Sequence, residues 1–352
     1  MMHLQKKYLI NRRTFLSRTS RAVGFGAASL LIGPQMSVTG QPNLTATWER
    51  VDAVNEGPSP RANHAMIFDP EGIQLLVFGG RDRNGFLNDV WAFSLEDRTW
   101  TELTPNGNGP QPRRTPATIY DPDAQQLVTY SGQGSSFFND IWGLDLATLS
   151  WNEFLDAPRP VPRYGTVLAH DPARQAAYTF AGFTSERGRF DDTWRFSLAS
   201  NTWEELNLDQ ERPSRRCLHM GAFDSDRDQF MIYGGQRSGP LGDLWSFDPT
   251  TESWREIVTD NQPAPRMFSS FLYADQFQQM LVYGGAGSSV FGDLWFFDTE
   301  REQWSELAAN GEETPENRQS HSAVWITGLG MMMFGGSTTS GSANDLWKLS
   351  FS

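Results

Sequence analysis

The stretch Leu75-Leu76-Val77-Phe78-Gly79-Gly80, followed by Asn88-Asp89-Val90-Trp91, carries the pattern that decides the fold. A short apolar run ends at a glycine pair, and an aspartate stands two residues before a tryptophan. The tryptophan recurs at intervals of 51, 52, 51, 50 and 52 residues, at Trp91, Trp142, Trp194, Trp245, Trp295 and Trp347. A repeat of this length predicts an array of similar structural units.

A second tryptophan series runs in step with the first. Its members are separated by 52, 51, 52, 51 and 50 residues, at Trp48, Trp100, Trp151, Trp203, Trp254 and Trp304. Trp325 alone stands outside both series. The second glycine of the pair is present in every unit, whereas Ser131 and Ala181 replace the first in two units. We interpret the periodic tryptophans as packing positions between thin sheets.

Each unit contains short β-rich runs separated by turn residues such as Asp69-Pro70, which favours four strands and no helix. The sixth unit ends at Ser352 without a tryptophan of the second series, while Trp48 precedes the first unit. The sequence therefore predicts an all-β, six-bladed β-propeller with four antiparallel strands per blade. The segment around Trp48, Thr47–Val51, should supply the outermost strand of the last blade. Such closure removes an exposed sheet edge.

The combination of a repeat arginine, a glycine pair and Asp-x-Trp resembles kelch-repeat propellers over residues 45–351. The resemblance implies one propeller domain over residues 41–352 that acts as a binding or interaction module. The alternative is a periplasmic enzyme of the sialic-acid mutarotase (epimerase) or small-molecule lyase type, and the sequence leaves open whether the protein is catalytic. The iron-site spacing Glu-x-x-x-Asp-x-x-x-His of kelch nitrile-specifier proteins ends here in Pro213, so its histidine is missing.

The first 40 residues have the character of a processing segment. They carry six basic residues and no acid, and their apolar stretch Ala22–Ile32 is too short to span a bilayer. The motif Asn11-Arg12-Arg13-Thr14-Phe15-Leu16-Ser17 resembles a twin-arginine export signal. We therefore expect a signal peptide over residues 1–40, a periplasmic or secreted mature protein, and no transmembrane span in it.

Composition excludes further classes of protein. Cys217 is the single cysteine, so a disulfide scaffold is impossible within the chain. We interpret it as a small buried residue. The net charge of −13 argues against binding to nucleic acid, because affinity for phosphate backbones is largely cationic.

One arginine stands where the chain enters the innermost strand of each unit: Arg61, Arg113, Arg163, Arg216, Arg266 and Arg318. The topology predicts a ring of guanidinium groups at one channel mouth. Such a ring suits an anionic small molecule or an acidic protein segment. The other interpretation is that each arginine pairs with a backbone carbonyl or a repeat aspartate as part of the blade geometry. The repeat aspartates themselves look like turn-capping groups.

His64, His219 and His321 each follow a repeat arginine by three residues and are the candidate metal ligands. Blades one and four would lie on opposite sides of the channel, so we expect no metal site and no cofactor. Two charged loops, Arg81–Arg83 and Glu186–Arg189, break the repeat pattern. They are the best sequence clue to what distinguishes this propeller.

Overall fold

The computed structural model describes residues 44–155, 158–208 and 211–352. The signal segment expected over residues 1–40 lies outside these ranges. Every regular element within them is a β-strand. No helix long and apolar enough to cross a membrane occurs among the described residues.

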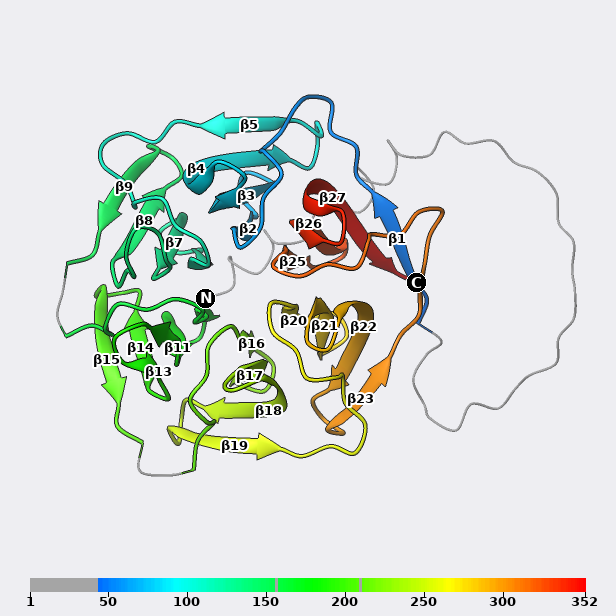
Figure 1. The fold of residues 1–352 in the computed structure, drawn as a ribbon. Helices are drawn as coiled ribbons and strands as arrows, with labels where there is room; N and C mark the ends of the chain where they lie inside the picture. The colour runs from blue at the N-terminus through cyan, green and yellow to red at the C-terminus, as the bar shows by residue number, and fades with distance from the viewer. Residues whose placement is uncertain (1–43, 156–157, 209–210) are drawn as a thin grey trace, which may run out of the picture. The chain divides into compact units, whose positions relative to one another are not determined.

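Six antiparallel sheets lie side by side around one axis, as predicted (Figure 1). Blade one contains β2 (Ala65–Asp69), β3 (Gln74–Asp82), β4 (Gly85–Ser94) and β5 (Trp100–Leu103). Blade two contains β6 (Ala117–Asp121), β7 (Gln126–Tyr130), β8 (Ile141–Asp145) and β9 (Ser150–Glu153). Blade three contains β10 (Ala169–Asp171), β11 (Ala176–Phe180), β14 (Thr193–Ser197) and β15 (Thr202–Leu206), with the separate hairpin β12 (Phe183–Thr184) and β13 (Gly188–Arg189).

The remaining blades follow the same order from the axis outward. Blade four contains β16 (Met220–Asp224), β17 (Gln229–Gln236), β18 (Pro240–Asp248) and β19 (Ser253–Ile257). Blade five contains β20 (Ser270–Ala274), β21 (Gln279–Ala286), β22 (Val290–Asp298) and β23 (Gln303–Glu306). Blade six contains β25 (Ser322–Ile326), β26 (Gly330–Thr338) and β27 (Gly341–Phe351), then β1 (Ala46–Arg50) and β24 (Ala309–Asn310).

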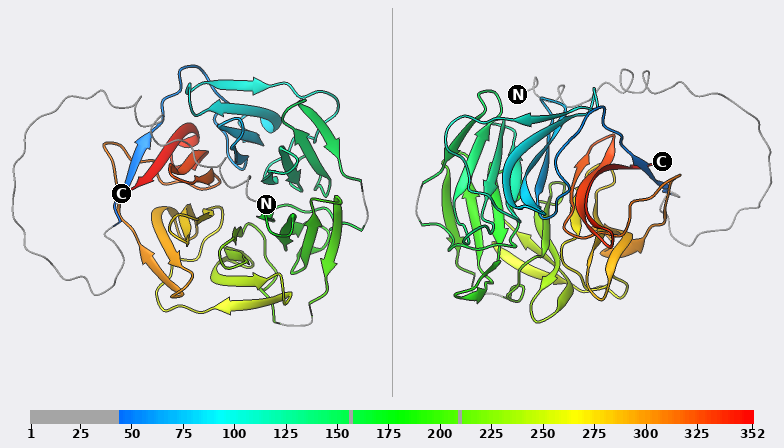
Figure 2. Two further views of the ribbon diagram at one scale, coloured as in Figure 1. Left: turned by 180° about the vertical axis from the view of Figure 1, so that it is seen from behind. Right: turned by 45° about the horizontal axis from the view of Figure 1, so that its top comes forward.

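The predicted closure of the last blade is confirmed. Strand β1 pairs antiparallel with β27, with Trp48 opposite Leu349 (Figure 2). The short strand β24 adds a parallel fifth strand on the outer side of β1, which the sequence did not predict. Pairing the first described strand with the last one closes the ring and covers the edge of β27.

The second tryptophan series forms the seams between blades. Each of these side chains packs on the aromatic residue that precedes the glycine pair of the preceding blade. The six ring-centroid distances lie between 4.8 and 5.5 Å, for the pairs Trp48–Tyr283, Trp100–Phe334, Trp151–Phe78, Trp203–Tyr130, Trp254–Phe180 and Trp304–Tyr233. The periodic tryptophans therefore pack neighbouring sheets together, as the repeat predicted.

The glycine pair bends the chain within the second strand of a blade or directly after it. The first position has a φ between 55° and 66°, which serine and alanine tolerate, and Ser131 and Ala181 occupy it in two blades. The second position has a φ near 100°, as at Gly80. A Cβ on Gly80 would lie 2.7 Å from Cβ of His64, so both conformation and space demand glycine there.

Trp325 has a different role from the other tryptophans. It packs with Phe277 and Phe351, and its indole Nε1 donates to the carboxylate of Asp275 over 2.8 Å. These contacts tie blade six to blade five on the face opposite the glycine bends.

Candidate functional site: the mouth of the propeller

The repeat arginine, aspartate and tryptophan form one hydrogen-bonded unit in every blade. In blade four, Arg216 donates to both carboxylate oxygens of Asp243 over 2.8 and 2.5 Å, and Trp245 Nε1 donates to the same carboxylate over 2.8 Å. The other five pairs are also bidentate: Arg61–Asp89, Arg113–Asp140, Arg163–Asp192, Arg266–Asp293 and Arg318–Asp345. We interpreted these aspartates from the sequence as turn or backbone caps, but their main partners are the guanidinium and the indole.

The backbone of each repeat arginine binds the preceding blade. Arg113 N donates to Leu87 O over 2.8 Å, and Gly80 N donates to Arg113 O over 2.9 Å. The same two bonds recur at every seam, including Arg61 with Ala343 and Gly336 across the closure. Each repeat arginine therefore joins two blades, through its backbone to one and through its guanidinium to the other.

The six guanidinium groups have little capacity left for a ligand. All six arginine residues are at most 1% exposed. Besides the aspartate, each guanidinium donates to the carbonyl at the first position of its own glycine pair and to the carbonyl two residues before the arginine, as Arg61 does to Gly79 and Ser59. Of the two interpretations of the arginine ring, the geometry supports pairing within the blade.

The electrostatics agree with this arrangement. Burial opposes ionisation of the Asp243, Asp293 and Asp345 carboxyls, but hydrogen bonds from arginine and tryptophan outweigh it, so the pKa of each lies below its ordinary value. The carboxylates remain charged and neutralise the guanidinium groups. Truncating either partner would leave a buried, uncompensated charge.

A ring of backbone hydrogen bonds surrounds the axis two residues after the repeat arginines. All six of its residues have positive φ: Asn63, Thr115, Gly165, Leu218, Phe268 and Ser320. Five of the six neighbouring pairs are joined by an N–H···O bond of 2.6 to 3.4 Å. Among the residues that the structure describes, Thr115 and Gly165, at the seam of blades two and three, lack this bond. The sequence offered little signal for the ring, because four of the six are neither glycine nor asparagine.

Twelve residues beside this ring form its rim. In each blade the residue after the repeat arginine forms an isolated β-bridge with the residue after the glycine pair. Both residues therefore lie on the same face of the propeller, here called the mouth face. The six bridges are Ala62–Arg81, Arg114–Gln133, Tyr164–Phe183, Cys217–Gln236, Met267–Ala286 and Gln319–Ser337. These twelve residues differ from blade to blade and include two arginines and no acid. They are the part of the mouth that differs from one blade to the next.

Two half-buried arginines, Arg114 of the rim and Arg189 beside it, are held by neutral groups. Arg114 donates to the side-chain oxygen of Gln133 over 3.0 and 2.5 Å, and Arg189 donates to that of Gln236 over 3.2 Å. Neither is in an ion pair with any residue of the described ranges. Their positive charges are positioned without being neutralised, in contrast to those of the repeat arginines.

A cluster of three aromatic rings lies beside these two arginines. Tyr164 and Phe183 are perpendicular with centroids 5.8 Å apart, and Phe137 packs against both. The guanidinium carbon of Arg114 lies 5.2 Å from the Tyr164 ring centroid, and that of Arg189 lies 5.4 Å from the Phe183 ring centroid. Both contacts are within the range of cation–π attraction.

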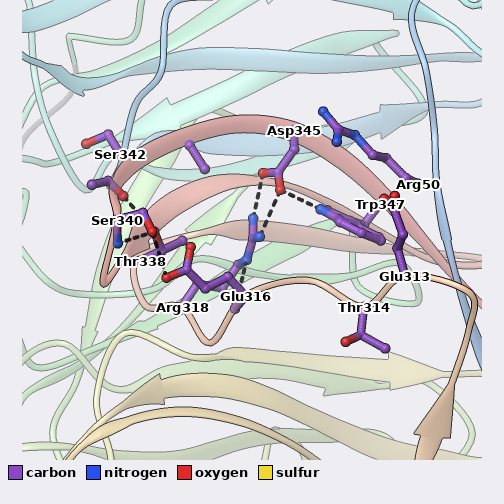
Figure 3. A pocket seen from close by; sticks show the side chains of 12 residues that line it. Arg50, Glu313, Thr314, Glu316, Arg318, Thr338, Ser340, Ser342, Asp345 and Trp347 are labelled. Atoms are coloured by element: carbon purple, nitrogen blue, oxygen red, sulfur yellow. Dashed lines mark hydrogen bonds and ion pairs between the residues drawn. The ribbon is translucent and has the colours of Figure 1, made fainter.

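A pocket of about 530 Å³ lies at blade six (Figure 3). Glu313 and Glu316 line it, together with Arg50 and with Arg318, whose guanidinium is paired with Asp345. Because Arg318 is already neutralised, the two glutamates make the pocket acidic. It does not suit the anionic ligand expected from the sequence.

The three histidines are buried packing residues at separate seams. Their rings meet Phe334, Phe180 and Tyr283 of the preceding blade edge-on, for His64, His219 and His321 respectively. Burial, together with the nearby repeat arginine, lowers the pKa of each to about 3. Across residues 44–155, 158–208 and 211–352, no group of three or more His, Cys, Asp or Glu side chains is placed to hold a metal ion.

Cys217 is buried, at 1% exposure, as the sequence indicated. Burial raises the pKa of its thiol, and the nearby charge of Arg189 only partly opposes this effect. The thiol is therefore protonated at neutral pH. This environment does not activate a nucleophile.

The six closed blades, with one Arg–Asp–Trp unit in each, define a kelch-repeat propeller. The sequence matches the KLHDC2/KLHL20/DRC7 Kelch-repeats domain over residues 42–157 and 155–336. The chain belongs to this family.

Curated relatives share the repeat at low identity. Host cell factor homolog hcf-1 of Caenorhabditis elegans is 27% identical over 285 residues, 72% of this chain and 35% of that protein. Multiple epidermal growth factor-like domains protein 8 of Mus musculus is 25% identical over 225 residues, which is 59% of this chain and 8% of that protein. The dynein alpha chain of the flagellar outer arm of Chlamydomonas reinhardtii is 26% identical over 233 residues, which is 62% of this chain and 5% of that protein. The match spans about a third or less of these relatives.

Proposed function

We propose that this protein is an exported kelch propeller that binds an acidic segment of a protein partner on its mouth face. The observation that carries the proposal is the pair Arg114 and Arg189, which glutamine amides position without neutralising them. Arg81, on the same rim, is exposed and stacks on Phe86. A concentrated positive rim on a molecule of net charge −13 favours an anionic partner at that place.

The distribution of charge over the mouth face agrees with this proposal. We call the segments that lead into each innermost strand and those that follow each glycine pair the mouth loops. Outside the repeat pairs, the described mouth loops of blades one to four contain nine arginines and six carboxylates, whereas those of blades five and six contain four carboxylates and no arginine. An acidic segment would therefore be attracted to the rim of blades one to three and repelled from blades five and six. The face orients such a partner as well as attracting it.

An interaction role fits the relatives. In each of them the matched region is a minor part of a longer protein. That arrangement is typical of a module that presents a surface to a partner, and the proposal extends this role to the present chain.

Export is the second part of the proposal and rests on the twin-arginine motif alone. Replacing Arg12 and Arg13 together by lysine should retain the protein in the cytoplasm of a host with a twin-arginine translocase. Fractionation of cells expressing the full chain measures this. Equal export of both forms through that translocase would refute the assignment.

The binding role is tested by titration of the full chain with short peptides that are acidic, neutral or basic, followed by calorimetry. The acidic peptide should bind, and its affinity should fall as salt is raised, because exposed charges are screened. Sialic acid and other sugar acids serve as small-anion probes. Binding of the sugar acids without the peptide, or acceleration of anomer exchange in an NMR assay, would favour the mutarotase alternative.

A further inference from the structure

We propose that the pocket at blade six binds one aromatic side chain of a protein partner, in the place that a phenylalanine of the chain itself occupies in three other blades (Figure 3). Arg318 and Ala343 both line this pocket. It is separate from the arginines on which the proposed function rests. The two binding sites can therefore be tested independently of each other.

One position of the repeat determines what lies beside the repeat arginine of each blade. It stands four residues before the tryptophan of the first series, and its carbonyl oxygen accepts a hydrogen bond from the backbone N–H of the next repeat arginine around the ring. The six residues at this position are Leu87, Phe138, Phe190, Leu241, Phe291 and Ala343. Blade six therefore carries a methyl group where the other five blades carry a large apolar side chain.

In three blades the residue at this position is a phenylalanine whose ring lies over the repeat arginine. The guanidinium carbon lies 4.3, 4.2 and 4.3 Å from the ring centroid in the pairs Arg113–Phe138, Arg163–Phe190 and Arg266–Phe291. These guanidinium groups also pair with their aspartates, so neutralisation by a carboxylate does not prevent the cation–π contact. The chain thus shows three times that an aromatic ring fits beside this arginine.

Blade six has the same arginine and an open pocket instead of the ring. The pocket volume of about 530 Å³ lies within the range of about 300–1,000 Å³ that is typical of ligand pockets. Thr338 also lines the pocket, but blade three carries Thr184 at the matching position together with Phe190, so a threonine there is compatible with a ring. Arg318 is no more exposed than the other repeat arginines. A ring in the pocket therefore contributes packing and excludes water, and it has no charge to neutralise.

The carboxylates of the pocket indicate which part of a partner the aromatic residue comes from. Glu313 and Glu316 line the pocket, and Glu316 accepts hydrogen bonds from the hydroxyl groups of Thr339 and Ser340. Like charges repel, so acidic neighbours of the aromatic residue would weaken binding. We therefore expect the aromatic residue in a neutral or basic stretch of the partner, outside the acidic segment that the rim of blades one to three attracts.

The test fills the pocket with a ring from the chain itself. Ala343→Phe gives blade six the residue of blades two, three and five, and Leu241→Phe is the matched change in blade four, away from the pocket. The full chain and both variants are titrated by calorimetry with a neutral peptide carrying one central phenylalanine, and with its alanine analogue. The native protein and Leu241→Phe should bind the phenylalanine peptide about tenfold more tightly or better, whereas Ala343→Phe should lose this preference.

Melting temperatures show whether each variant is folded. Should Ala343→Phe unfold, Ala343→Leu takes its place in the titration, because it copies the residue of blades one and four and should also reduce the preference. Equal affinity of the native protein for the two peptides would overturn the site, as would an unchanged preference in the variant with the filled pocket. Acidic peptides should bind the native protein and Ala343→Phe alike, so failure of this site leaves the proposed function standing.

Discussion

The guanidinium of Arg216 lies fully buried on the carboxylate of Asp243, while its backbone N–H and C=O bind Phe190 and Gly182 of the preceding blade. One residue thereby joins two sheets and holds a charge that its own blade neutralises. Six such residues close the ring. This explains why an arginine recurs in every blade.

Replacing Arg216 by alanine should destabilise the propeller by about 3–5 kcal/mol, because Asp243 would keep a partly buried, unpaired charge. The adjacent residue supplies the control. Arg215 is exposed and lies 3.5 Å from Asp191, so Arg215→Ala should cost about 0.5 kcal/mol or less. Urea denaturation followed by tryptophan fluorescence measures both, and similar midpoints for the two variants would contradict the role assigned to the pair.

The two positions of a glycine pair should respond differently to serine. Gly79→Ser reproduces the residue that blade two carries at Ser131 and should cost about 1–2 kcal/mol of αL strain. Gly80→Ser adds a Cβ 2.7 Å from His64 and should prevent folding or cost far more. Soluble yield and melting temperature compare the two variants, and an equal effect would show that the strand bend is not as crowded as it appears in the native fold.

Stability should fall as pH is lowered from about 6.5 toward 3. The buried histidines have a folded-state pKa of about 3 against an ordinary value of 6.5, so the unfolded chain binds more protons than the folded chain in this window. Protonation of the histidines therefore favours unfolding between these pH values. The histidine contribution to the loss of stability levels off below pH 3. Asp243, Asp293 and Asp345, whose pKa is depressed, add their loss of stability mainly below their ordinary value of 3.8.

The double variant His219→Thr with His321→Ser tests the source of this pH dependence. It uses residue types that blades three and five carry at the same position, Thr166 and Ser269. Its unfolding free energy should vary less between pH 4 and 6.5 than that of the native protein. If the unfolding free energy of the variant changed with pH as much as that of the native protein, the pH dependence would come from other groups.

Starting the chain at Asp52 should promote self-association. The truncation removes β1, which leaves the edge of β27 unpaired and uncovers Tyr283 where Trp48 packed at 4.9 Å. Analytical ultracentrifugation should show dimers or larger species. A stable monomer with native melting temperature would contradict the closure.

The two tryptophan series made the blade number, the strand count and the closure predictable. A side chain repeated about every 50 residues marks the same place in each blade, so a local pattern carries global information. The same periodicity singled out the six repeat arginines. Their side-chain partners were left open, because Arg61 and Asp89 are 28 residues apart and many acids are available.

Periodicity in the sequence determined the architecture, since each blade buries the same aromatic and glycine positions against the next. Only the tertiary structure decided which arginine charges are neutralised by a carboxylate and which are not. Arginine looks the same in sequence whether a carboxylate or a glutamine amide lies beside it. A buried charge must be neutralised, whereas a half-buried one can remain unneutralised, and only the folded packing separates Arg216, bound to Asp243, from Arg114, held by Gln133.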